Sequence, residues 1–271
     1  MDVQKLFRLD GRIALVTGGS RGIGAMIVEG YLASGCERVY ISARKTAQVE
    51  AAVKDFNSRY PGKVIGLPID LSTVDGCRAL AKELGAREER LDILVNNAGA
   101  AWGEPFEGFS EAGWDKVMDL NVKSPFFLTQ ALFGLLKAGG AAKGPDSQPA
   151  KVINIGSIDG QRLNPWETYS YQASKAAILY LTKRLAARLI HDNIIVTAIA
   201  PGAFESEMNK AARDHGDTVA KGIPARRIGI PEDMAAAAIY LAAPSGNYVI
   251  GDTITVDGGL VHADVKPSHD T

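Results

Sequence analysis

Short apolar runs alternate with longer stretches of helical periodicity along the whole chain, and this alternation constrains the fold most strongly. The apolar runs are rich in Val, Ile and Leu and cover residues 13–17, 38–42, 63–69, 91–96, 151–157, 194–200 and 253–257. Runs of this kind are typical of strands covered on both faces. Helical patterns cover residues 23–33, 46–58, 74–84, 111–136, 171–190 and 232–241. The sequence therefore predicts an α/β fold, with a doubly wound, mostly parallel sheet of seven strands and helices on both faces.

No internal repeat or linker divides the 271 residues. The stretch GGAAKGPDSQPA at 139–150 is interpreted as a surface loop, because a predicted helix and a predicted strand flank it directly. We therefore expect one domain, residues 1–271, of which residues 258–271 form a C-terminal tail.

The charge and the metal-binding residue types exclude several classes of function. The 30 Lys and Arg residues nearly balance the 31 Asp and Glu residues, whereas nucleic acids and acidic membranes require a basic excess. Cys36 and Cys77 are far apart, and the four histidines lack ligand spacing, so no metal site is expected. The N-terminus does not resemble a signal peptide, and the longest apolar run, 235–243, is too short to cross a bilayer. These features predict a cytoplasmic protein that binds neither nucleic acid nor membrane.

In a doubly wound sheet, ligands bind outside the carboxyl ends of the strands. Directly after the first predicted strand the sequence reads TGGSRGIG, residues 17–24, and a predicted helix follows. The glycines let a pyrophosphate approach the backbone at the helix N-terminus. An ordinary turn is the alternative, but the position between strand and helix favours a dinucleotide site. The candidate cofactor-binding residues are Gly18, Ser20, Arg21, Gly22, Ile23 and Gly24.

The end of the second predicted strand indicates which dinucleotide to expect. Sites selective for NAD usually carry an acidic residue here, bound to the ribose 2′-hydroxyl group. This chain instead has Ala43 followed by Arg44 and Lys45, with Arg21 in the glycine loop. Cations without an acid suit a 2′-phosphate, which arginine binds with two donors. Solvated cations are the alternative, but at a helix start they oppose the helix dipole. The sequence therefore predicts NADP(H).

Two further strand ends fit the same ligand. Asp70 and Leu71 follow the third predicted strand, where the carboxylate is placed to accept from an adenine amino group. The fourth predicted strand runs into Asn97, Ala98 and Gly99, whose small residues leave room beside a cofactor. A structural role is the alternative for the asparagine, because Asn side chains stabilise turns.

Candidate catalytic residues follow the fifth predicted strand. Ser157 lies at its end, and Tyr171 and Lys175 are four residues apart, which places them on one face of a helix. Tyrosine has an ordinary pKa of about 10. A neighbouring ammonium, joined by an oxidised nicotinamide ring, would stabilise the phenolate and lower that pKa. Tyr169 is a less suitable candidate because it lies off that face.

These residues together resemble the short-chain dehydrogenase/reductase family, whose fold is a Rossmann domain. The matching motifs are TGGSRGIG, DL at 70–71, NNAG at 96–99, LNV with Asn121, Ser157, YQASK at 171–175 and PG at 201–202. Within the family, the order of the stretches RIALVTGGSRGIG, LDILVNNAG, VMDLNV, VINIGS and RIGIPEDM most resembles the NADPH-dependent 3-oxoacyl-[acyl-carrier-protein] reductases, in particular the rhamnolipid-type branch. The resemblance covers nearly the whole chain.

The resemblance implies a role for each matching residue. Tyr171 would protonate the carbonyl oxygen, Lys175 would bind the nicotinamide ribose, and Ser157 would hydrogen-bond the developing alkoxide. Asn121 would hold a water of the proton relay with its side chain and local backbone. The remaining cofactor contacts implied are Pro201, Gly202 and Ser206, the last in a position where many relatives have Thr.

The substrate is expected to be a small carbonyl or alcohol compound, such as an acyl-carrier-protein or CoA thioester. Three stretches would line its pocket, 100–109, 159–168 and 203–226, which offer Trp102, Phe106, Leu163, Trp166, Phe204, Met208 and Ile223. An apolar lining suits an acyl chain, although core packing or a subunit contact is the alternative for most of these side chains. Lys221, Arg226 and Arg227 could contact an acidic carrier, or simply be solvated.

Two alternative functions remain open, as does the assembly. One is the dehydrogenation of a sugar, polyol, steroid or xenobiotic ketone, and the other is nucleotide binding without catalysis. The intact set Asn121, Ser157, Tyr171 and Lys175 argues against the second. The resemblance also implies a homotetramer, with one interface formed by residues 111–136 and 171–190 and the other by the last helix and strand.

Overall fold

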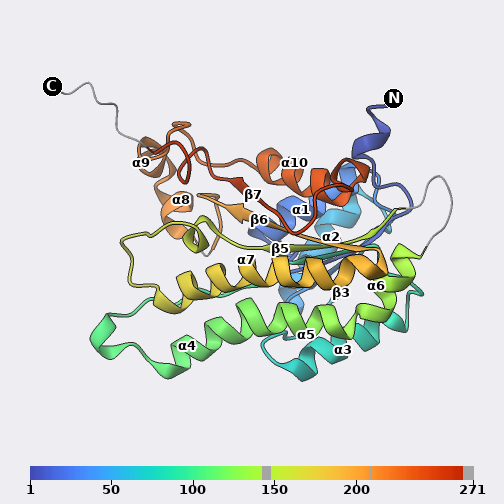
Figure 1. Ribbon diagram of the computed structural model, residues 1–271, viewed down its shortest axis with the longest axis horizontal. Coiled ribbons are helices and arrows are strands. Elements are labelled where there is room, and N and C mark those ends of the chain that lie inside the picture. Colours follow the sequence, from blue (N-terminus) through green and yellow to red (C-terminus); the bar gives the residue numbers. More distant parts are fainter. Residues whose placement is uncertain (142–147, 208, 265–271) are drawn as a thin grey trace.

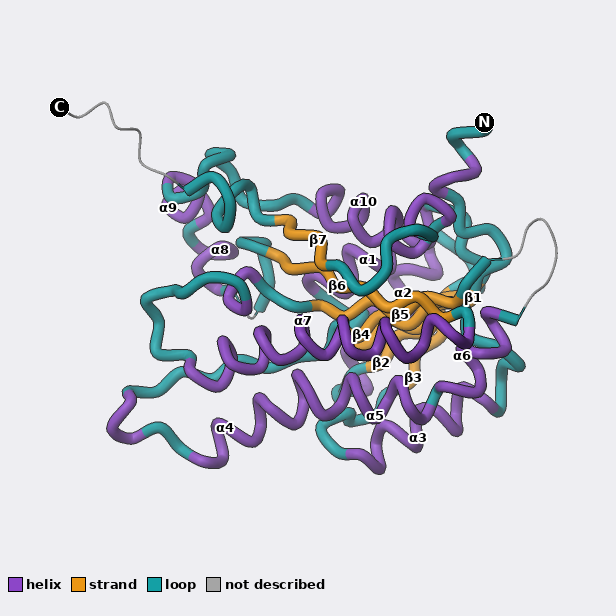
Figure 2. The backbone as a smooth tube through the Cα atoms, in the orientation of Figure 1, coloured by secondary structure: helices purple, strands orange, loops and turns teal. Residues whose placement is uncertain are grey.

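A single parallel sheet forms the centre of the protein. The computed structural model describes residues 1–141, 148–207 and 209–264. The sheet has seven strands in the order β3-β2-β1-β4-β5-β6-β7 (Figure 1, Figure 2). The strands are β1 (Ile13–Thr17), β2 (Arg38–Ser42), β3 (Val64–Leu67), β4 (Ile93–Asn96), β5 (Ala150–Ile155), β6 (Ile194–Pro201) and β7 (Thr253–Val256). Every pairing is parallel, which confirms the predicted fold class and makes the sheet parallel throughout.

Helices cover both faces of the sheet, because the central strands bury side chains on both sides. One face carries α1 (Gly22–Ala33), α2 (Thr46–Arg59) and α10 (Pro231–Ala242), as Figure 1 shows. The other carries α3 (Val74–Gly85), α5 (Ser124–Ala131), α6 (Phe133–Gly140) and α7 (Tyr169–Leu189), with α4 (Glu111–Met118) beside α7. Two short helices, α8 (Lys210–Asp214) and α9 (Gly216–Lys221), lie beyond the end of β6. No described helix is long and apolar enough to cross a membrane.

The predicted elements differ from the observed ones mainly in the fourth helical stretch. Residues 111–136 were expected to form one helix, but a π-helical turn, Asp119–Lys123, separates α4 from α5, and a break at Leu132 precedes α6. The helices α8 and α9 were missed because they are short and lack an apolar stripe. Part of the loop predicted at 139–150 is helical to Gly140, and its residues 142–147 lie outside the described residues, as do residues 265–271 of the tail.

The order of the strands positions the site. After β3 the chain returns past β1 to form β4, so the connections leave β1 and β4 in opposite directions. Loops that diverge in this way leave a crevice at the carboxyl ends of these two strands. The register that pairs Val16 with both Ile41 and Val95 brings the ends of β1, β2 and β4 to the same edge.

Candidate active site

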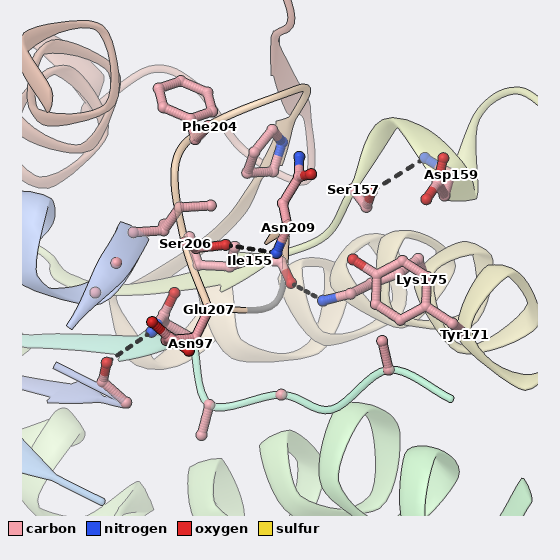
Figure 3. A pocket seen from close by; sticks show the side chains of 18 of the residues that line it. Asn97, Ile155, Ser157, Asp159, Tyr171, Lys175, Phe204, Ser206, Glu207 and Asn209 are labelled. Carbon is pink, nitrogen blue, oxygen red and sulfur yellow. Dashed lines mark hydrogen bonds between the residues drawn. The ribbon is translucent and has the colours of Figure 1, made fainter. Parts of the chain in front are cut away.

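A cavity of about 720 Å³ lies along the carboxyl edge of the sheet. Its walls come from the loop between β1 and α1, the ends of β2, β4 and β5, the start of α7 and the segment after β6 (Figure 3). Every cofactor-binding residue predicted from the sequence lines it, as do Ser157, Tyr171 and Lys175, whereas Asn121 does not. The sheet thus brings together residues that are far apart in the sequence.

The glycine loop is shaped by close backbone contacts. Gly18 and Gly22 have φ values of +65° and +53°, a conformation that favours glycine. A Cβ atom on Gly24 would lie 2.2 Å from the carbonyl oxygen of Gly18. Only glycine therefore allows α1 to begin this close to β1. The backbone at the N-terminus of α1 is left accessible to an anion.

Asn97 and Thr17 brace this loop. The Nδ2 atom of Asn97 donates to the carbonyl oxygens of Thr17, at 2.9 Å, and Gly18, at 3.2 Å. The Thr17 hydroxyl accepts from the backbone N–H groups of Asn97 and Ala98, both at 2.9 Å. Asn97 therefore has the structural role that the sequence left open for it, and it lines the cavity as well. Thr17 was missed, although its place at the end of the first strand could have drawn attention to it.

One end of the cavity is cationic. Arg21, Arg44 and Lys45 line it, and within the described parts of the chain none of them forms a salt bridge. Ala43 occupies the position where an acid would bind a 2′-hydroxyl group. Asp70 lies nearby, with Oδ1 accepting from the N–H of Ser72 at 3.0 Å. These residues can hold a dinucleotide that carries a 2′-phosphate.

Three of the four predicted catalytic side chains, Ser157, Tyr171 and Lys175, meet at the other end of the cavity (Figure 3). The Nζ atom of Lys175 donates to the carbonyl oxygen of Ile155 at 2.9 Å and lies 5.5 Å from the centre of the Tyr171 ring. The Ser157 hydroxyl accepts from the backbone N–H of Asp159 at 3.1 Å. Tyr169 does not line the cavity, and its hydroxyl donates to Glu167. Ser157, which follows β5, thus lies at the same end of the cavity as Tyr171 and Lys175 in the first turns of α7.

Burial dominates the protonation of this group. It raises the pKa of Tyr171 to about 12, with a further increase from the charge of Asp159 and a partial decrease from the hydrogen bond with Ser157. Burial lowers the pKa of Lys175 to about 8, against the opposing effect of Asp159. In the protein alone, desolvation of the phenolate therefore dominates at Tyr171, and the decrease expected beside an ammonium and an oxidised nicotinamide ring stays a prediction for the cofactor complex. Near neutral pH, Tyr171 carries its proton.

Asn121 lies behind the cavity, in the π-helical turn, rather than in its wall. Its Oδ1 atom accepts from the N–H of Ala100 at 2.8 Å, and its Nδ2 atom donates to the Ala100 carbonyl and to the Ser174 hydroxyl, both at 2.9 Å. The side chain therefore fastens the loop after β4 to α7. These bonds use both N–H donors of the amide and one lone pair of its oxygen, and the water-holding role implied by the resemblance stays a prediction.

The predicted substrate-binding side chains divide into two groups. Trp166, Phe204 and Ile223 line the cavity, whereas Trp102, Phe106 and Leu163 do not. Phe106 is 72% exposed and Leu163 is 88% exposed, while Trp102 packs under the Lys116 ammonium at 4.3 Å. Met208 lies outside the described residues. Asp159, Arg162, Asn164 and Val219 also line the cavity and lie in two of the three predicted stretches, whereas Leu260 lies outside all three.

The cationic cluster proposed for an acidic carrier, Lys221, Arg226 and Arg227, lies outside the cavity. Both of its arginine side chains have partners within the protein. Arg227 forms a salt bridge with Asp233. The Nη1 atom of Arg226 donates to the carbonyl oxygen of Lys221 at 2.7 Å. These contacts agree with the interpretation of the cluster as an ordinary solvated face.

Known proteins share this arrangement over nearly their whole length. The family model for the short chain dehydrogenase matches residues 12–217. The rhamnolipids biosynthesis 3-oxoacyl-[acyl-carrier-protein] reductase of Pseudomonas aeruginosa is 46% identical over 257 residues, which cover 94% of this chain and 98% of that protein. A 2-dehydro-3-deoxy-D-gluconate 5-dehydrogenase of Dickeya dadantii is 35% identical over 261 residues, which cover 93% and 96%.

A solved structure is also similar to this chain. The RhlG/NADP active-site complex of Pseudomonas aeruginosa has a TM-score of 0.87 at 44% identity and covers 94% of this chain and 98% of its own. The glycine loop, the set of Ser, Tyr and Lys at one cavity and these matches agree. The chain is an oxidoreductase that belongs to the short-chain dehydrogenase family.

Proposed function

We propose that the protein is an NADPH-dependent reductase that converts a 3-oxoacyl thioester to a 3-hydroxyacyl thioester. The observation that carries the proposal is one continuous cavity, with Arg21, Arg44 and Lys45 at one end and Ser157 and Tyr171 at the other. The similarity to a 3-oxoacyl-[acyl-carrier-protein] reductase and to a structure solved with NADP supports the substrate and the cofactor.

Different residues of the cavity would bind different parts of the cofactor. The backbone of the glycine loop would bind the pyrophosphate, and Arg21, Arg44 and Lys45 would bind the 2′-phosphate. Asp70 and Gly99 line the cavity between the cofactor's two expected ends. NADPH, when bound, supplies the hydride for the reduction.

The catalytic side chains position and protonate the substrate carbonyl. Ser157 donates a hydrogen bond to the carbonyl oxygen, where negative charge develops during reduction. Tyr171 gives its proton to the same oxygen, and the raised pKa of Tyr171 means that this proton is present near neutral pH. Lys175 is fixed by the Ile155 carbonyl, which keeps its ammonium beside the Tyr171 ring. The amide of Asn121 holds α7, which carries both residues, against the loop after β4.

An acyl substrate is favoured by the apolar wall of the cavity beyond Tyr171. Trp166, Phe204, Val219, Ile223 and Leu260 contribute to this wall. These side chains suit an alkyl chain. Arg162, Asn164 and Glu207 line the cavity as well and offer polar partners for the hydroxyl groups of a polyol. Dehydrogenation of a sugar acid, the activity in the name of the Dickeya dadantii relative, is the alternative.

We also infer that the chain works as a single domain and assembles as a homotetramer. One sheet contains all seven strands, which supports a single domain. The helices α4 and α7 contact each other on one flank of the molecule, where α5 also lies, and α10 and β7 lie on the opposite side (Figure 1). These surfaces are available for the two expected interfaces, and multi-angle light scattering of the purified protein measures the number of chains.

The decisive experiment is NADPH oxidation with acetoacetyl-CoA, followed by the absorbance of NADPH and repeated with NADH. We expect rapid, NADPH-selective turnover. The variant Tyr171→Phe should lose about 10²–10⁴-fold in rate. It should still bind NADPH, because the variant lacks only the hydroxyl group. NADPH binding without turnover of the thioester would overturn the acyl substrate and leave a panel of ketones and sugar acids to be assayed.

A further inference from the structure

Asp159 lies beside the catalytic residues, on a short turn that packs directly against α7. This turn, η4 (Ile158–Gly160), follows Ser157, and the backbone N–H of Asp159 donates to the Ser157 hydroxyl at 3.1 Å (Figure 3). A Cβ atom on Gly160 would lie 2.6 Å from the carbonyl oxygen of Lys175. The absence of that Cβ lets the turn approach the backbone of α7 at Lys175, and Asp159 lines the same cavity as Tyr171 and Lys175.

The side chain of Asp159 lines the cavity, and in the described ranges of the chain it forms no salt bridge. The other charged groups at this part of the cavity have partners. Arg162 pairs with Asp264 at 3.3 Å and donates to the carbonyl oxygen of Leu260. Glu207 pairs with Arg213 at 2.6 Å.

We propose that Asp159 is a positioning residue that keeps the proton on Tyr171 and the positive charge on Lys175, so that the site is held in the form that reduces a carbonyl. The proposal rests on the reductase function proposed above. Asp159 acts through these two side chains, not by contact with the substrate. Nothing in the motifs that identify the family specifies an acid at this position.

Electrostatics gives the direction of the effect. A carboxylate disfavours a nearby phenolate and favours a nearby ammonium, so its charge raises the pKa of both Tyr171 and Lys175. The polar groups that line this part of the cavity are Asp159 on η4, the Ser157 hydroxyl after β5, the Ile155 carbonyl on β5, the loop at Asn97–Gly99, and the ion-paired Arg162 and Glu207. Asp159 is therefore the acid that opposes the effect of burial on Lys175.

The test is the pH dependence of kcat/KM for acetoacetyl-CoA reduction in Asp159→Asn. Reduction requires a protonated Tyr171 and a charged Lys175. Loss of the carboxylate lowers the pKa of both groups, so each loses its proton at a lower pH. The alkaline limb of the profile should therefore move to lower pH, by about one unit for a partly exposed carboxylate. Asp159→Glu keeps the charge and should restore the wild-type limb. An unchanged limb in Asp159→Asn overturns the proposal.

A second measurement does not depend on the substrate. The Cζ resonance of Tyr171 is followed against pH by NMR in protein labelled with ¹³C-tyrosine and is identified by its absence in Tyr171→Phe. We expect this resonance to titrate at lower pH in Asp159→Asn than in the wild type. If the thioester is not reduced but the titration moves, the substrate is wrong and the role of Asp159 stands. If thioester reduction is rapid and the titration does not move, Asp159 has no such role.

Discussion

Replacement of Gly24 by alanine tests whether only glycine allows α1 to pack this closely against the end of β1. The added Cβ atom would lie 2.2 Å from the Gly18 carbonyl oxygen and 2.5 Å from Nδ2 of Asn97, where ordinary contacts begin at 3.4 Å. The helix or the loop must therefore move by more than an ångström. Both obstructing atoms belong to the network that braces the loop, so they cannot yield independently.

The magnitude follows from the contacts that such a movement breaks. Asn97 would lose its hydrogen bonds to the Thr17 and Gly18 carbonyl oxygens. Each is worth about 1 kcal/mol, and overpacking costs about 1–3 kcal/mol, so we expect a loss of about 3–5 kcal/mol in the free energy of unfolding. NADPH affinity should also fall, because the backbone groups that bind the pyrophosphate are displaced.

Urea unfolding followed by tryptophan fluorescence, together with NADPH titration, measures both effects. The matched control is Gly134→Ala, at an exposed position in α6 where an added Cβ would meet nothing within 4 Å. Alanine is a better helix former than glycine, so this control should gain about 0.5–1 kcal/mol. If Gly24→Ala were as stable as the wild type and bound NADPH equally well, the packing argument would be wrong.

Two further substitutions address the cofactor and the core. Arg44→Ala should weaken NADPH binding about tenfold and leave NADH binding unchanged, because the side chain would contact only the 2′-phosphate; equal losses for both dinucleotides in fluorescence titrations would contradict this. Lys151, only 1% exposed, has its pKa lowered to about 7 by burial and by Arg12. Below that pH the ammonium is charged in both states, so its burial opposes folding fully, and the penalty fades as the pH rises from 7 to 10.5. Lys151→Met should therefore stabilise the protein by about 2 kcal/mol at acidic pH and progressively less toward alkaline pH. Urea unfolding across this range measures it, with exposed Lys183→Met as the control, and a pH-independent gain would count against the explanation.

Much of the fold was accessible from the sequence because each strand of this sheet is buried on both faces. Burial of that kind requires nearly continuous apolar runs, and all seven were recognised, with two, β1 and β2, placed to the residue. The π-helical turn at Asp119–Lys123 was not accessible, since the residues around it have ordinary helical periodicity. The three side-chain hydrogen bonds of Asn121 within this turn run to Ala100 and Ser174, residues distant in sequence.

The sequence by itself determined the order of the elements, the glycine loop and the helical spacing of Tyr171 and Lys175, because these are local properties of the chain. Tertiary structure alone decided the environment of those residues. It placed the turn that carries Asp159 against α7, placed the Asn121 amide behind the cavity wall, and buried Tyr171 so that its pKa is raised. Desolvation and electrostatic effects depend on everything within several ångströms of a group, and most of those neighbours come from distant parts of the chain.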